Sequence, residues 1–157
     1  MAVAFSSEAL GKFQAIIARY PKKEAAMLPV LYLAQAEFGH LGPQAIDYVA
    51  KLMDQPPARV HGVVSFYTMF NTKPIGRHHI QICRTLSCAL AGAERMTAFI
   101  QQRLGIEPGQ TTPDGRFTLS EVECLASCGT GPMMQINDDY YENLTEETVT
   151  AILDRLK

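Results

Sequence analysis

The residues best suited to chemistry in this sequence are its four cysteines, which fall into two close pairs. Cys83 and Cys88, the first pair, are separated by four residues, and Cys124 and Cys128, the second pair, by three. Four thiolates make a complete ligand set for a tetrahedral metal ion or for an iron–sulfur cluster. Because the chain has no other cysteine, we expect the four to act together.

Three other roles of paired cysteines compete with this prediction. The segment from Met1 to Gly11 lacks the basic start and long apolar run of an export signal, so we do not expect the disulfides of an exported protein. A thioredoxin-type dithiol has the C-x-x-C spacing, which neither pair shows. Structural zinc stays open, because its ligand pairs are commonly two to four residues apart.

The residues around the sulfurs favour an iron–sulfur cluster over zinc. Each pair follows a strand-like segment. Small side chains surround the two pairs: Ser87, Ala89, Ala91 and Gly92 near the first, and Ala126, Ser127, Gly129 and Gly131 near the second. Small side chains let backbone N–H groups approach sulfur, and such hydrogen bonds help to set a cluster's reduction potential. We therefore predict one [2Fe–2S] cluster, with a zinc-stabilised binding module as the alternative.

Composition excludes several classes of function. The chain has 157 residues, of which 47% are apolar and 19% are charged, as expected for a globular protein with a real core. A net charge of −2 and the lack of a basic run give no reason to expect nucleic acid. No apolar run reaches the ~18 residues of a membrane span, and no glycine-rich nucleotide-binding motif is present. We therefore expect neither direct membrane insertion nor NADH binding by this chain.

The first part of the chain shows a helical pattern. The predicted helices cover residues 7–20 and 23–38, and two more open at Pro43 and Pro56. Pro29 falls inside the second of them, where we expect a kink or a fresh start. A cluster of polar, proline and glycine residues then marks a boundary near Pro74. We therefore predict a small helical bundle as the domain of residues 1–74.

The second part, residues 75–157, alternates strands with helices. Strands are predicted over 78–83 and 117–123, a hairpin over 133–137 and 140–143, and helices over 89–104 and after Thr145. This β-α-β-β-β-α order is close to the thioredoxin core, which gives an α+β or α/β fold class. Both cysteine pairs then follow strand ends, and Cys88 stands just before a helix. Since the ends of parallel strands lie side by side, the two pairs can share one site.

The sequence resembles the 24 kDa (E) subunit of bacterial NADH:quinone oxidoreductase, respiratory complex I. The matching stretches are Val60–Tyr67, Thr85–Cys88, Gly109–Phe117 and Glu123–Leu125. The resemblance covers nearly the whole chain and implies a helical domain followed by a thioredoxin-like [2Fe–2S] ferredoxin domain. It also implies that all four cysteines are cluster ligands. Pro132 stands where thioredoxin-like folds often carry a cis proline.

The same resemblance implies a function. The subunit carries no catalytic residues of its own, and its cluster exchanges electrons with the FMN of a neighbouring NADH-binding flavoprotein subunit. Other partners would be the iron–sulfur subunits of the peripheral arm, in the cytoplasm at the inner face of the cell membrane. The alternative is the equivalent subunit of an NAD-linked formate dehydrogenase or hydrogenase.

Arg84 directly follows the first ligand and admits two interpretations. It is either a solvated surface side chain or a cation that stabilises the reduced cluster. The second interpretation predicts that removing its charge lowers the reduction potential.

Overall fold

The computed structural model describes residues 3–156, which separate into two compact units. The first unit extends to Pro74, and the second begins at Ile75. Each unit has a hydrophobic core of its own. That the two units are domains with separate roles stays a prediction, to which the proposed function returns.

The first unit is built from helices. They are α1 (Ser7–Ile17), the 3-10 helix η1 (Lys23–Ala26), α2 (Met27–Phe38), α3 (Pro43–Met53) and α4 (Pro57–Phe66). The Ser6 hydroxyl accepts a hydrogen bond from the Ala9 N–H and so caps α1. Helix α2 is central, because Val30 and Leu31 on it are fully buried in the core of this unit. The helical bundle predicted from the sequence is therefore present.

Two predicted helix limits in this unit were wrong. Helix α1 ends at Ile17 rather than at residue 20, and the chain then makes a turn. The predicted helix over 23–38 is divided between η1 and α2, and the α-helix starts at Met27. Pro29 therefore lies in the first turn of α2, where its missing N–H leaves no helical hydrogen bond unmade.

The second unit contains a four-stranded sheet in the order β2-β1-β3-β4. Its elements are β1 (His78–Cys83), α5 (Leu86–Leu90), α6 (Ala93–Leu104), β2 (Phe117–Val122), the 3-10 helix η2 (Cys128–Thr130), β3 (Met134–Ile136), β4 (Asp139–Tyr141) and α7 (Glu146–Arg155). Strand β1 runs parallel to β2 and antiparallel to β3. The predicted order of strands and helices is confirmed, although β3 and β4 are shorter than expected.

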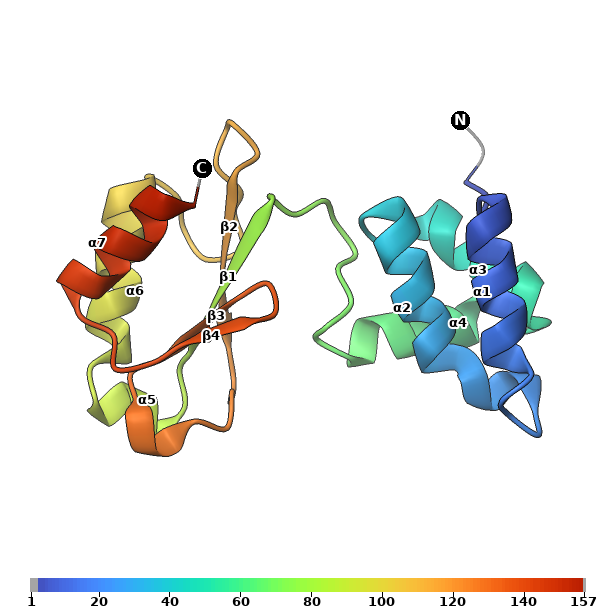
Figure 1. The fold of residues 1–157 in the computed structure, drawn as a ribbon, viewed down its shortest axis with the longest axis horizontal. Helices are drawn as coiled ribbons and strands as arrows, with labels where there is room; N and C mark the ends of the chain where they lie inside the picture. Colours follow the sequence, from blue (N-terminus) through green and yellow to red (C-terminus); the bar gives the residue numbers. More distant parts are fainter. Residues whose placement is uncertain (1–2, 157) are drawn as a thin grey trace. The chain divides into compact units, whose positions relative to one another are not determined.

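Helices α6 and α7 lie side by side against the sheet (Figure 1). Ile80 and Ile82 of β1 are fully buried in one core with Met96 and Ile100 of α6. An ion pair of 2.6 Å between the Arg103 guanidinium and the Asp154 carboxylate joins the two helices at the surface. The core thus fixes the position of β1, which carries the first cysteine.

The predicted helix over 89–104 was wrong in its first turn. Two helices stand there, α5 and α6, and Ala91 and Gly92 separate them. Gly92 has a φ of 101°, a left-handed conformation that glycine adopts without steric cost and that interrupts the helix.

The Gly131–Pro132 peptide bond is cis, as the resemblance implies. Within residues 3–156, no helix has the length and apolar character needed to cross a membrane.

Candidate metal centre

Both cysteine pairs lie at one end of the sheet of the second unit. Cys83 is the last residue of β1 and pairs in parallel register with Val122, the last residue of β2. Cys124 follows the end of β2 by two residues, so it lies at the same end of the sheet as Cys83. Helix α5, which contains Cys88, lies beside η2, which begins at Cys128 (Figure 1). The fold brings together two pairs that the sequence separates by two elements.

The structure corrects the surroundings of the first pair. Cys83 is the last residue of its strand, as predicted, but Cys88 lies within α5 rather than before a helix. Both are 2% exposed, whereas Cys124 and Cys128 are exposed. Both cysteines of the first pair are therefore held by regular structure, whereas Cys124 lies in the loop after β2 and Cys128 begins η2 at the surface.

Hydrogen bonds already engage two of the sulfurs. The Cys83 Sγ lies 3.3 Å from the Thr85 hydroxyl and donates to the Glu123 carbonyl at 3.2 Å. The Cys124 Sγ accepts from the Ala126 N–H at 3.3 Å. Contacts of this kind orient a sulfur ligand and adjust its basicity. The predicted role of small residues beside sulfur is thus present at Ala126.

The thiols of the first pair differ in acidity. Burial raises the pKa of Cys83, but hydrogen bonds from the Thr85 hydroxyl and backbone outweigh it, so the pKa lies below its usual value. Burial raises the pKa of Cys88, and the neighbouring sulfurs of Cys83 and Cys128 raise it further. Cys88 therefore feels sulfurs of both pairs, as expected if the four thiolates share one site. Because thiolates repel one another, four of them need a cationic metal centre between them.

The Cys88 sulfur lies close to Gly131, where a residue with a side chain would crowd it. A Cβ atom at residue 131 would lie 3.3 Å from the Cys88 Sγ and 3.5 Å from the Ala91 Cβ. The backbone after η2 therefore passes directly over the sulfur. The donor set is entirely sulfur, and soft thiolate ligands suit iron–sulfur clusters and zinc. The residues present therefore fit a thiolate-bound metal centre.

A model of the thioredoxin-like [2Fe-2S] ferredoxin family matches residues 13–157. The chain belongs to this family. The predicted fold is confirmed, and so is the cofactor predicted from the sequence, a [2Fe–2S] cluster. The family match favours the cluster over zinc, which spacing alone left open.

Curated relatives match over nearly the full length of the ferredoxin chain. The E subunit of NADH-quinone oxidoreductase from Rickettsia bellii is 44% identical over 156 residues, which cover 98% of this chain and 93% of the relative. The E 2 subunit of NADH-quinone oxidoreductase from Rhizobium meliloti is 42% identical over 146 residues, with coverage of 93% and 87%. The resemblance drawn from the sequence is therefore confirmed.

A solved structure shares the fold. A crystal structure of an NAD+-reducing [NiFe]-hydrogenase in the air-oxidized state aligns with a TM-score of 0.73 at 23% sequence identity. The alignment covers 83% of the ferredoxin chain and 22% of the hydrogenase chain. At this identity the likeness concerns the fold alone.

The complete ligand set of the ferredoxin stays a prediction. All four cysteines are free thiols, and no disulfide joins them. Within the described residues, 3–156, no three His, Cys, Asp or Glu side chains gather into a metal-binding group. The two pairs lie at the same end of the sheet, and α5, which contains Cys88, lies beside η2, which begins at Cys128.

The charge of Arg84 is shared with a neighbouring acid. Its guanidinium donates to the Glu123 carboxylate at 2.5 Å, and both side chains are mostly exposed, at 57% and 70%. The carboxylate raises the pKa of Arg84, which stays a cation. The side chain is therefore solvated and paired with Glu123, and its effect on the reduction potential of the cluster stays a prediction. Sequence reasoning missed Glu123, although it directly precedes Cys124.

Replacing Arg84 with alanine should lower the cluster's reduction potential by roughly a few tens of millivolts, because the Glu123 charge is then left alone beside it. Glu123→Gln should raise the potential by a similar amount, and the double variant Arg84→Ala, Glu123→Gln should return close to the wild type. Added salt should shrink both shifts, since exposed charges are screened. A redox titration followed by EPR measures them. Equal potentials in all four proteins would contradict an electrostatic effect of this pair.

Proposed function

We propose that this chain is the electron-transfer subunit of an NADH:quinone oxidoreductase, which passes single electrons through one [2Fe–2S] cluster. The observation that carries the proposal is the near full-length match to proteins named as E subunits of NADH-quinone oxidoreductase, at 44% and 42% identity. Membership of the [2Fe-2S] ferredoxin family supports it independently of those names.

The four cysteine thiolates would hold the cluster, two from each pair. When bound, the cluster supplies one-electron chemistry at a low potential, of about −400 mV for all-cysteine ligation of the ferredoxin type. The protein's own residues would orient the four sulfurs and keep the first pair out of solvent. Cys83 and Cys88 are fixed by β1 and α5, Thr85 hydrogen-bonds one sulfur, and Gly131 admits another.

The electron donor would be the FMN of a neighbouring flavoprotein subunit, which also binds NADH. Support comes from the sequence, which contains no nucleotide-binding motif, and from the exposure of Cys124 and Cys128 at the surface. We further propose that other iron–sulfur subunits of the peripheral arm are partners, and that the complex works at the inner face of the cell membrane. No residue of this chain is assigned a catalytic role.

The proposal is tested by mixing the loaded protein with the flavoprotein subunit of the same organism and adding NADH. The [2Fe–2S] EPR signal should appear only when both proteins are present. Failure of NADH to reduce the cluster through this flavoprotein, in a sample that dithionite does reduce, would contradict the proposed place in the complex. It would favour instead the alternative flavoprotein of an NAD-linked formate dehydrogenase or hydrogenase.

We also propose that residues 75–157 hold the cluster alone and that residues 1–74 serve partner docking. The two hydrophobic cores share no residue, and all four cysteines lie after the boundary at Pro74. A fragment of residues 75–157 should therefore contain a full complement of iron and sulfide, but bind the flavoprotein at least ~10-fold more weakly. Iron analysis and a binding titration measure the two properties. Binding of the fragment at full strength would refute the docking role.

A further inference from the structure

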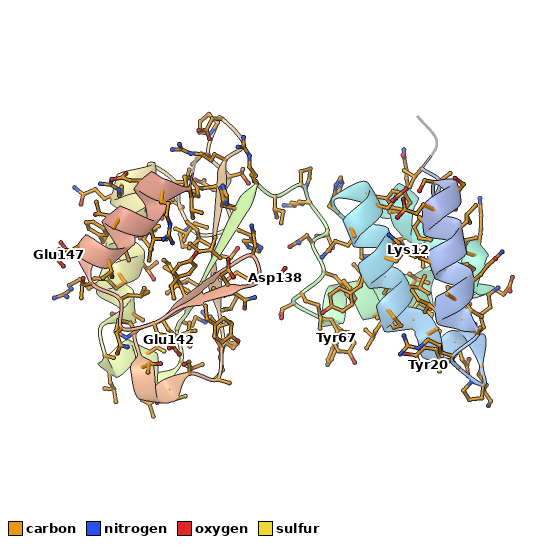
Figure 2. The ribbon with its side chains drawn as sticks, in the orientation of Figure 1. Lys12, Tyr20, Tyr67, Asp138, Glu142 and Glu147 are labelled. Carbon is orange, nitrogen blue, oxygen red and sulfur yellow. The ribbon has the colours of Figure 1, made fainter. Side chains whose placement is uncertain are left out.

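Glu142 reaches back to the loop that carries the second cysteine pair. It directly follows β4, and its carboxylate accepts hydrogen bonds from the hydroxyl groups of Ser127 and Thr130, the latter at 2.8 Å. Both hydroxyls donate to the same oxygen, Oε1. Figure 2 shows Glu142 at the end of the hairpin nearest to α5, whereas Asp138 lies at the opposite end. One exposed carboxylate thus accepts hydrogen bonds from Ser127 and Thr130, which lie on either side of Cys128 in the sequence.

The backbone around Glu142 is itself well anchored. The Asn143 N–H donates to the Thr130 carbonyl at 2.7 Å, and the Leu144 N–H donates to the Pro132 carbonyl at 2.9 Å. Leu144 is 4% exposed and belongs to the core of the second unit. The carboxylate therefore projects from a fixed segment, so it can hold a loop that has little regular structure of its own.

The loop needs such support more than the first pair does. Cys128 is exposed and opens η2, which spans only Cys128–Thr130. The preceding residue, Ser127, donates to Glu142, and its hydroxyl lies 2.8 Å from the Thr130 hydroxyl, which donates to the same carboxylate. The two hydroxyls lower the pKa of Glu142, so that it is ionised at neutral pH and accepts strong, charge-assisted bonds.

We propose that Glu142 is a positioning residue for the cluster: by holding Ser127 and Thr130, its carboxylate keeps Cys128 in the place where it binds iron. The inference rests on the proposed ligand role of the second pair. Groups that hydrogen-bond a metal ligand directly contribute about 10- to 100-fold to metal affinity or activity, and Glu142, one residue further from the metal, should contribute at the low end of this range. Glu142 touches no sulfur and acts only through its two hydroxyl partners.

The test compares the full-length, cluster-loaded protein with three variants. Glu142→Ala removes the acceptor, Glu142→Gln keeps an amide oxygen in its place, and Asp138→Ala removes another exposed acid at the far end of the hairpin. The rate of cluster loss to an iron chelator is followed by absorbance, and the reduced samples are examined by EPR. Glu142→Ala should lose the cluster about tenfold faster and show an altered EPR line shape. Glu142→Gln keeps an acceptor but loses the charge, so its rate of cluster loss should lie between those of the wild type and Glu142→Ala. Asp138→Ala should lose the cluster at the wild-type rate.

The outcomes separate this inference from the proposed function. A wild-type rate and EPR spectrum in Glu142→Ala would overturn the positioning role, and so would a Glu142→Gln variant as labile as Glu142→Ala. If Glu142→Ala fails to fold, Ser127→Ala and Thr130→Val test the same bonds, and each should quicken cluster loss by about threefold. Unchanged loss in both would again overturn the role. A wild-type protein that binds no iron would instead overturn the proposed function itself.

Discussion

Replacing Cys88 with serine is expected to abolish stoichiometric cluster binding. The thiolate is the group that binds iron, and a serine hydroxyl stays protonated and is a much poorer ligand. Cys88 is 2% exposed, so no water molecule or external thiol can easily take the place of its sulfur. Iron and acid-labile sulfide per chain are therefore expected to fall below about a tenth of the wild-type content.

The control is Ser87→Ala, an exposed neighbour on the same helix, which should retain a full cluster. The corresponding serine variants of Cys83, Cys124 and Cys128 should also lose the cluster. The two exposed positions should leave more residual iron, since solvent or an added thiol can reach them. Full iron content in Cys88→Ser would remove Cys88 from the ligand set.

Adding a side chain at Gly131 is expected to displace the Cys88 sulfur. A Cβ atom there would stand 3.3 Å from that sulfur, closer than most such contacts, and the sulfur belongs to a buried residue of α5. Overpacking of this kind costs about 1–3 kcal/mol. Gly131→Ala should therefore lose its cluster to a chelator about tenfold faster than the wild type, and Gly131→Val should fail to retain it.

Gly129 offers a matched control in the same loop. A Cβ atom there would meet nothing within 4 Å, so Gly129→Ala should keep the wild-type rate of cluster loss. The two glycines differ in their distance from Cys88 rather than in a need for left-handed backbone, because neither has a positive φ. Equal behaviour of the two alanine variants would show that space at residue 131 does not matter for the cluster.

The strands and most helices of this chain could be predicted because their patterns are local. Ile80 and Ile82 alternate with more polar residues and end as the buried face of β1, and Pro43 opens α3 at its first position. The break between α5 and α6 was missed for a local reason too. Gly92 is the residue that could have indicated a helix break, but it and the small residues around it were interpreted only as neighbours of the cysteine sulfurs.

The surroundings of the cysteines could be predicted only in part. Spacing identified the four sulfurs, and parallel strand ends explained how they meet, because both are properties of sequence order. The role of Glu142 could not be predicted, because its hydrogen bonds to Ser127 and Thr130 form only when the β3–β4 hairpin folds back beside η2. The ion pair of Arg84 with Glu123 likewise depends on the pairing of β1 with β2, which places the two residues across from each other.

Chemical analysis of the purified protein, together with EPR after reduction, tests the cluster most directly. We expect a red-brown protein with two irons and two sulfides per chain, and one unpaired electron spin per chain after reduction by dithionite. Serine at any of the four cysteines should remove that signal. A colourless protein with one zinc ion per chain and no iron would show that these cysteines do not hold a [2Fe–2S] cluster.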